Sequence, residues 1–109
     1  MSESYHVLAQ LSPAATTLTT LYTAPTLTTT TISSIVICNT NSTASTFRVS
    51  IQVNGGVDNI KQYLYYDLPL LANDTFIATI GITLGTGDII AAYAGSTNIA
   101  FNLFGVEIQ

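Results

Sequence analysis

Alternation of hydrophobic and polar residues with a period of two dominates the chain. It is clearest within Ala44–Val53, where every second residue from Phe47 onward is hydrophobic. Because neighbouring side chains of a strand point to opposite faces, this pattern predicts a strand buried on one side. Asn54-Gly55-Gly56 follows directly, and residues that accept a positive φ predict a tight turn there. The predicted hydrophobic face consists of Phe47, Val49, Ile51 and Val53.

A second alternation runs from Thr75 to Ile82 and predicts another half-buried strand. Six further segments rich in β-branched or aromatic residues are bounded by Pro, Gly, Asn or Asp, as strands commonly are. No segment has the sustained 3.6-residue period and caps of an amphipathic helix. The hydrophobic face of the second strand consists of Phe76, Ala78, Ile80 and Ile82. The six further predicted strands are Tyr5–Gln10, Leu18–Ala24, Thr30–Cys38, Tyr63–Asp67, Asp88–Ala94 and Ile99–Ile108.

Eight short strands separated by turn residues are typical of an all-β sandwich or barrel. We expect an antiparallel two-sheet sandwich of about eight strands, of jelly-roll or Greek-key type, since both topologies use about this number. The chain has 109 residues, and domains of about 100 to 150 residues are common, so residues 1–109 are expected to form a single domain. The predicted core includes Phe47, Val49, Ile51, Phe76, Ile80, Phe101 and Leu103.

Charged residues make up only 7% of the chain, where about 25% is usual. The polar surface must instead come from hydroxyl and amide side chains, with 18 Thr, 9 Ser and 7 Asn. Thr favours strands, and Ser and Asn favour turns, which agrees with an all-β fold. Arg48 and Lys61 are the only strong cations against six carboxylates, and a nucleic-acid surface needs several cations. We therefore expect no direct binding of nucleic acid.

Cys38 is the only cysteine and His6 the only histidine, so an intrachain disulfide is impossible and a structural zinc site lacks ligands. Cys38 follows Ile-Val-Ile and is interpreted as a small apolar residue of a core strand. We expect no metal and no cofactor. The N-terminus lacks the features of a secretory signal, and no apolar run approaches the roughly 18 residues of a membrane span. Synthesis in a reducing cytoplasm and no membrane partner are expected.

The candidate catalytic residues point to turns rather than to an active site. Asp58, Asp67, Asp74 and Asp88 lie beside predicted turns, where Asp commonly binds backbone N–H groups. His6 is not accompanied by a Gly-x-Ser-x-Gly nucleophile motif. Gly85-Thr86-Gly87-Asp88 lacks the Lys and the helix of a phosphate loop and predicts a hairpin turn. The sequence therefore predicts no enzyme and no catalytic residue.

Tyrosine offers apolar area together with a hydroxyl group and is frequent at binding surfaces. Alternation predicts that Tyr63 and Tyr65 share one face of a strand and that Leu64 and Tyr66 share the other. One of these faces must pack inside, and the other is a candidate interface. Possible interface residues are Tyr63, Tyr65, Tyr66 and Tyr93.

A β-sandwich with few charges lacks the Lys residues that usually prevent strands from pairing edge to edge. Symmetric oligomers, or docking onto a larger assembly, cover such edges. The composition therefore favours a structural subunit that forms a homo-oligomer, in which self-association tolerates high salt because few ion pairs contribute.

Several segments resemble small all-β virion structural proteins of tailed bacteriophages. The resemblance covers most of the chain except the Thr-rich stretch Leu27–Ser34 and the loop Gly55–Lys61. The order and spacing of its segments carry the likeness, since each one alone is ordinary strand-and-turn sequence. The segments are Tyr5–Gln10, Pro13–Thr16, Leu21–Thr23, Leu71–Phe76, Ile80–Leu84, Gly87–Ile90 and Asn102–Ile108.

This resemblance implies a non-enzymatic part of the virion. The favoured role is a capsid decoration (cement) protein, which would stabilise the head by bridging coat subunits. Its partners would be the major capsid protein or other virion proteins, and its own copies, with a trimer favoured. The alternative is a tail, neck or fibre component, possibly a receptor- or glycan-binding module. The resemblance supplies no functional residues, because none matches a motif here.

Overall fold

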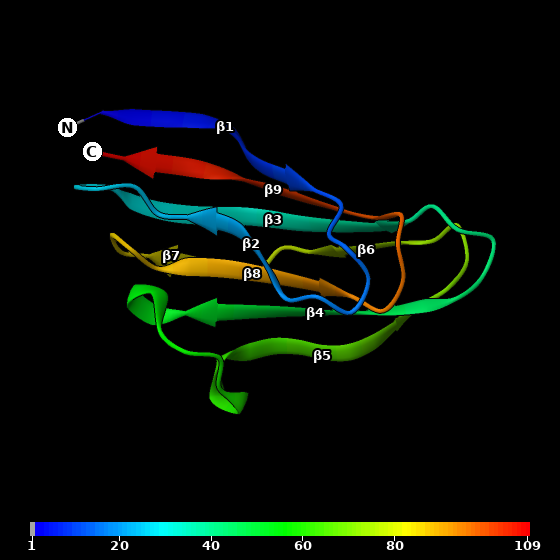
Figure 1. Ribbon diagram of the computed structural model, residues 1–109. Helices are drawn as coiled ribbons and strands as arrows, with labels where there is room; N and C mark the ends of the chain where they lie inside the picture. The colour runs from blue at the N-terminus through cyan, green and yellow to red at the C-terminus, as the bar shows by residue number, and fades with distance from the viewer. Residues whose placement is uncertain (1) are drawn as a thin grey trace.

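Nine strands form two antiparallel sheets within residues 2–109, which the computed structural model describes (Figure 1). The sheets pack face to face around a shared hydrophobic core, which confirms the predicted all-β sandwich. Apart from Thr75–Ile82, the strands lie close to the predicted segments, because strand-forming residues and the turn residues between them mark their positions in the sequence. The strands are β1 (Glu3–Leu11), β2 (Thr19–Thr23), β3 (Thr29–Asn39), β4 (Ser45–Gln52), β5 (Tyr63–Leu70), β6 (Thr75–Ala78), β7 (Ile82–Leu84), β8 (Ile89–Ala94) and β9 (Ile99–Ile108).

The connectivity is that of a jelly roll. The larger sheet has the order β1-β9-β3-β6, with β7 also paired to β3, and the smaller sheet has the order β2-β8-β4-β5. Because β6 and β7 pair with successive parts of β3, they act as one interrupted strand. The chain then has eight strands that pass between two four-stranded sheets, as a jelly roll requires. Strands β1, β2 and β5 lie at sheet edges (Figure 1).

The prediction of one continuous strand over Thr75–Ile82 is wrong. Ala78 pairs with Ile35 of β3, and Ile82 pairs with Ile32. The three residues 79–81 of the predicted strand therefore lie opposite only two residues, 33–34, of β3. The extra residue breaks the alternation, as a bulge does. Consequently Ile80, a predicted core residue, is 37% exposed.

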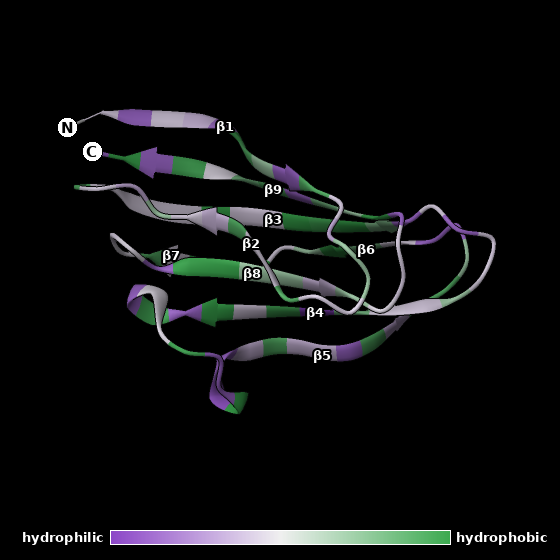
Figure 2. Cartoon of the chain, in the orientation of Figure 1, coloured by the Kyte–Doolittle hydropathy of each residue, from purple (hydrophilic) through white to green (hydrophobic). Residues whose placement is uncertain are grey.

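The core lies between the sheets and is almost entirely hydrophobic. Phe47 is fully buried, and its ring centroid lies 5.2 Å from that of Phe76, 6.0 Å from that of Tyr65 and 6.5 Å from that of Phe101. Figure 2 shows hydrophobic residues along β8 and along the second half of β3. Of the predicted core residues, Ile51 and Phe76 are partly buried against the core. Those that are fully buried are Phe47, Val49, Phe101 and Leu103.

Two buried polar side chains in the described residues differ in whether their polar atoms have hydrogen-bond partners. Asn39 is fully buried, and its Nδ2 lies within hydrogen-bonding distance of the carbonyl oxygens of Thr43, Leu70 and Leu71 at 2.9, 3.2 and 3.2 Å. Its Oδ1 accepts a hydrogen bond from the backbone N–H of Asn41. Asn39 therefore ties two loops together at one end of the sandwich.

By contrast, the Ser50 hydroxyl of β4 is buried and has no hydrogen-bond partner within residues 2–109.

A close backbone approach occurs in the other sheet, where a Cβ atom on Gly105 of β9 would overlap the carbonyl oxygen of Thr31 in β3. Only glycine fits this position without a shift of backbone.

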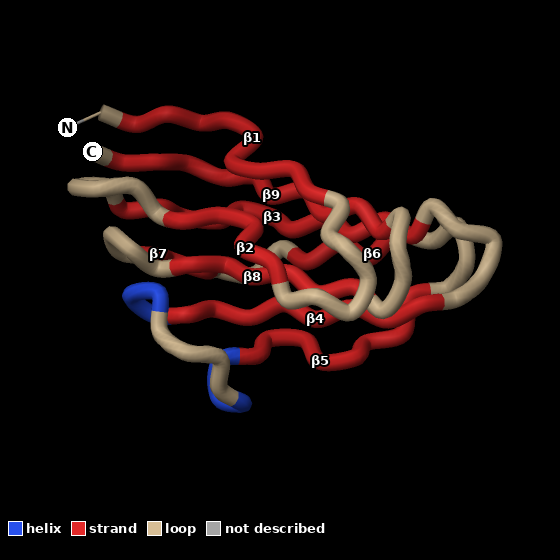
Figure 3. Tube along the Cα trace, in the orientation of Figure 1, coloured by secondary structure: helices blue, strands red, loops and turns tan. Residues whose placement is uncertain are grey.

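The loop between β4 and β5 contains two short 3-10 turns, Val53–Gly55 and Ile60–Gln62 (Figure 3). Asn54 and Gly55 have φ values of 57° and 69°, which confirms the predicted positive-φ turn. The turn opens a longer loop rather than a tight hairpin, and Val53 is consequently 69% exposed instead of facing the core. Asp88 fixes the start of the loop by accepting a hydrogen bond from the Asn54 N–H.

Candidate functional site

Three of the four tyrosines proposed for an interface lie together on the smaller sheet, and Tyr65 does not join them. Tyr65 packs inward against Phe47 and Phe76, whereas the ring of Tyr63 lies edge-on to that of Tyr66, with centroids 5.0 Å apart. The prediction that Tyr63 and Tyr65 share a face is therefore wrong. Its physical reason is that the pairing of β4 with β5 shifts register twice, which interrupts the alternation of β5.

Arg48 organises the outer face of the smaller sheet. Its guanidinium carbon lies 4.1 Å from the ring centroids of both Tyr66 and Tyr93, so the cation contacts two aromatic rings. Its Nε and Nη2 donate hydrogen bonds of 2.6 and 3.2 Å to the two carboxylate oxygens of Asp67. This pair holds the pKa of Arg48 above, and that of Asp67 below, its ordinary value. The charge of Arg48 is thus paired with that of Asp67.

A polar and aromatic groove lies beside this arrangement and has a volume of about 580 Å³. At one side, the Tyr63 hydroxyl donates a 3.1 Å hydrogen bond to Asp58 Oδ2. Burial, and then this hydrogen bond, raise the pKa of Tyr63. Tyr66 is 58% exposed, so part of its ring remains open to solvent. The groove is lined by Arg48, Asp58, Asn59, Ile60, Tyr63 and Tyr66.

A second groove has a volume of about 720 Å³ and is lined by both hydrophobic and polar residues. It lies along the same loop and combines Ile51 of β4, Leu64 of β5 and the loop residues Val53 and Val57. Val57 is 89% exposed and Ile60, on the same loop, is 86% exposed. This concentration of uncovered hydrophobic side chains, from residue 53 to residue 64, is here called the loop patch and consists of Val53, Val57, Ile60 and Leu64.

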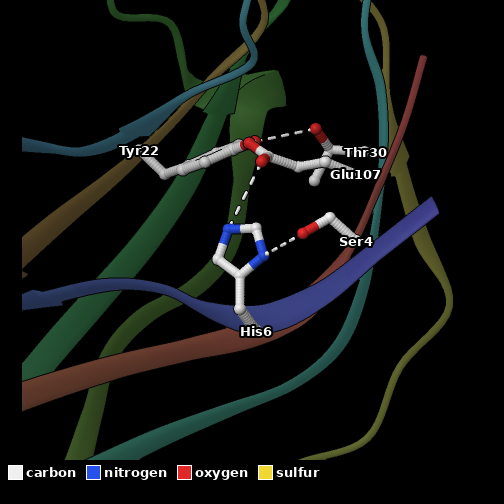
Figure 4. Close-up of polar contacts among 5 residues, drawn as sticks. All are labelled: Ser4, His6, Tyr22, Thr30 and Glu107. Carbon is white, nitrogen blue, oxygen red and sulfur yellow. Dashed lines mark hydrogen bonds and ion pairs between the residues drawn. The ribbon is translucent and has the colours of Figure 1, made fainter. Parts of the chain in front are cut away.

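A connected set of polar contacts among five side chains joins the strands β1, β2, β3 and β9 (Figure 4). Ser4 Oγ lies 3.1 Å from Nδ1 of His6, and Nε2 of His6 lies 3.3 Å from Glu107 Oε1. The Tyr22 hydroxyl donates a 2.5 Å bond to Glu107 Oε2 and lies 2.8 Å from the hydroxyl of Thr30. Tyr22 belongs to the smaller sheet, so its hydroxyl ties that sheet to β3 and β9 of the larger one.

This network brings a serine, a histidine and a carboxylate together, which the sequence analysis did not expect. The arrangement suits a structural clamp better than a nucleophilic site. Ser4 and His6 are exposed on an edge strand, and Glu107 is already engaged through both oxygens. Burial, and then the bond to Glu107, raise the pKa of Tyr22 to about 12, so the hydroxyl remains a donor at neutral pH.

The remaining candidates have local structural roles. Asp88 accepts hydrogen bonds from the N–H groups of Asn54 and Gly85, and Gly85–Asp88 forms the predicted turn. Asp67, also predicted to cap a turn, instead pairs with Arg48. Cys38 is a free, half-buried thiol on β3 rather than a core residue, because the residues facing the core there are Ile37 and Asn39.

Within residues 2–109 no three His, Cys, Asp or Glu side chains gather as a metal site, and no helix is long and apolar enough to cross a membrane. No protein-family model, curated protein or solved structure matches the chain. The site must therefore be interpreted from its own geometry.

The Arg48–Asp67 pair is a contact that the sequence analysis missed. The two segments could be predicted to pair, because only one loop separates them. The contact of Arg48 with Asp67 itself depends on the shifts in register between β4 and β5, which the sequence does not show. The clamp around Glu107 has no signal in the sequence, because Tyr22 and Glu107 are 85 residues apart and lie in different sheets.

Proposed function

We propose that this protein is a non-enzymatic virion structural subunit of a tailed bacteriophage, and specifically a capsid decoration protein that stabilises the head by bridging coat subunits. The observation that carries the proposal is the loop patch. Ile60 and Val57 are almost fully exposed in a chain with only 7% charged residues. Uncovered hydrophobic residues that cluster in this way are typical of surfaces that dock onto a partner.

The position of the patch supports docking by one end of the molecule. The patch lies on the loop after β4 and on the edge strand β5, and a groove of about 720 Å³ that is partly lined by hydrophobic residues runs beside it. A ridge of a coat subunit in this groove would cover Val53, Val57 and Leu64 together. Each copy would add a modest interface energy, and many copies would oppose outward strain from a packaged genome.

Homo-oligomerisation, with a trimer favoured, is part of the proposal because the edge strands β1 and β5 have few charges to prevent pairing. Apolar contacts are weakened little by salt, whereas exposed ion pairs are screened. We expect the molecular mass measured by light scattering to exceed that of one chain and to stay constant from low to about 1 M salt, roughly a 3 Å screening length. Dissociation into monomers at high salt would contradict this expectation.

The location in the particle is tested by cryo-electron microscopy of virions that contain the protein. A decoration protein is expected on the outer surface of the head in a fixed ratio to the coat protein, and its loss should weaken heads against heat or low ionic strength. Density at the tail, neck or fibres, together with loss of adsorption when the gene is deleted, would support the alternative role and overturn the decoration role.

A further inference from the structure

We propose that the groove formed by Arg48, Asp58, Tyr63 and Tyr66 is a carbohydrate-binding site that takes one neutral pyranose ring of a glycan. This binding activity is separate from the decoration role and does not depend on whether the protein lies on a head or a tail. The shape of the groove, its exposed aromatic ring and its charges support this assignment.

Tyr66 provides a fixed platform for a sugar ring. Its ring is 58% exposed, while Arg48 lies 4.1 Å from its centroid and Tyr63 contacts it edge-on at an interplanar angle of 89°. These two contacts fix the orientation of the ring before a ligand arrives, which lowers the cost of binding. A pyranose presents a face of C–H groups that stacks on an aromatic ring, and tyrosine suits this contact because it combines a flat apolar surface with a polar hydroxyl.

Polar groups beside the platform match sugar hydroxyls. Asp58 Oδ2 accepts the hydrogen bond of Tyr63, which leaves Oδ1 of this exposed carboxylate to accept from a sugar hydroxyl. Arg48 uses Nε and Nη2 for Asp67, so Nη1 can donate to a ring or hydroxyl oxygen. The groove thus offers a charged acceptor, a charged donor and an aromatic ring, which is the set that a polyhydroxylated ring can satisfy.

The charges of the groove select a neutral ligand. Arg48 is already paired with Asp67, and Asp58 contributes an unneutralised carboxylate, in a protein of formal net charge −4. A phosphate, a sialic acid or a uronic acid would therefore meet repulsion rather than attraction. The volume of about 580 Å³ falls within the range of small-molecule sites, about 300 to 1,000 Å³. The groove is open to solvent, so it admits one sugar unit of a longer glycan rather than enclosing a free molecule.

The test has two stages. The labelled recombinant protein is applied to an array of neutral and acidic glycans, and binding of methyl glycosides of glucose, galactose and mannose is then followed by NMR titration at millimolar concentrations. We expect the neutral glycans to be bound and the methyl glycoside of one of these sugars to shift the amide signals of Asp58, Tyr63 and Tyr66. Preference for sialylated glycans, binding of a peptide or protein in the groove instead, or no binding in either stage would overturn the proposal.

Substitutions in the groove and at matched exposed residues elsewhere show whether the groove itself binds the glycan. Tyr66→Ala removes the stacking platform, and Asp58→Asn removes the charged acceptor. Each variant is expected to weaken glycan binding about tenfold or more. Tyr66→Phe keeps the ring and should retain binding. The matched controls are Tyr5→Ala and Asp74→Asn, which change an exposed tyrosine and an exposed carboxylate on the other sheet or its connecting loops.

Equal affinity of Tyr66→Ala and Tyr5→Ala, with unchanged melting temperatures, would overturn the proposal. Because the altered side chains are exposed, thermal melting followed by circular dichroism is expected to show that all variants fold. A failure of glycan binding leaves the position of the protein in the virion unaffected, so the two proposals fail separately.

Discussion

Removing one hydroxyl group, by Tyr22→Phe, tests whether the clamp between the sheets stabilises the fold. Tyr22 is 8% exposed, and its hydroxyl bonds Glu107 at 2.5 Å and lies 2.8 Å from Thr30 Oγ1. The substitution keeps the aromatic ring and its packing. It leaves the buried Thr30 hydroxyl and one oxygen of Glu107 without this partner. The change in the free energy of unfolding therefore measures the contribution of these hydrogen bonds alone.

The expected loss follows from the two bonds. A hydrogen bond to a charged group contributes about 1.5 to 3 kcal/mol, and one between neutral groups about 0.5 to 1.5 kcal/mol. Tyr22→Phe should therefore lower the free energy of unfolding by about 2 to 4 kcal/mol. For a domain near this size each kcal/mol lowers the melting temperature by about 4 to 8 °C, so a decrease of roughly 10 °C or more is expected.

The pH dependence gives a second measurement of the same hydroxyl. Burial and the bond to Glu107 raise the pKa of Tyr22 to about 12 in the folded state, from 10.0 for an unperturbed tyrosine. Since the unfolded chain loses this proton first, the stabilisation is complete below about pH 10 and is lost as pH rises towards 12. The difference in unfolding free energy between the parent and Tyr22→Phe should shrink over that interval.

Urea denaturation monitored by circular dichroism at pH 7, 10 and 11.5 measures both quantities. Tyr5→Phe is the matched control, because the Tyr5 hydroxyl forms only an exposed 3.3 Å bond to Glu3 and its loss should change stability by less than about 0.5 kcal/mol. Equal stability of Tyr22→Phe and the parent at pH 7, or a difference that does not change up to pH 11.5, would refute the clamp.

Three further substitutions test the packing. Asn39→Ala should lower the free energy of unfolding by about 3 kcal/mol in urea denaturation, because the carbonyl oxygens that Nδ2 contacts lose this donor; a loss below 1 kcal/mol would contradict the role of Asn39. Gly105→Ala should prevent folding or lower the melting temperature by more than 10 °C, since its Cβ would overlap the Thr31 carbonyl; an unchanged melting curve would show that the strands can separate. Ser50→Ala should raise the free energy of unfolding by about 1 kcal/mol, because a buried hydroxyl without a partner is removed; destabilisation would indicate a bond that the structure lacks.

The strands could be predicted from sequence because their information is local. Phe47 and Val49 alternate with polar residues in β4 and are both fully buried, as the pattern indicated. The prediction failed where the register of neighbouring strands decides the outcome. The exposed Ile80 continues an unbroken alternation in the sequence, and only the pairing of β3 with β6 and β7 introduces the extra residue. A bulge depends on the pairing of two strands, so the sequence of one strand alone does not predict it.

The candidate site was predicted less well for the same reason. Tyr66 was correctly placed on a face different from that of Tyr65, yet the contact of Tyr63 with Tyr66 depends on the shifts in register of β5. The clamp around Glu107 could not be predicted at all, since it requires that β1, β2, β3 and β9 be placed side by side. The virion role and the oligomer remain predictions.

The pairing of β1 with β9 brings the two ends of the described chain together, and the backbone groups of Ser2 and Gln109 exchange hydrogen bonds of 3.0 and 2.9 Å. Fluorescent donor and acceptor groups attached at these ends would transfer energy efficiently while the sandwich is intact. An unfolded chain of about 100 residues expands to a radius of gyration of about 30 Å, which would separate the pair. Doubly labelled protein could thus signal its own opening in a mixture with other proteins, where calorimetry sees only the sum of all components.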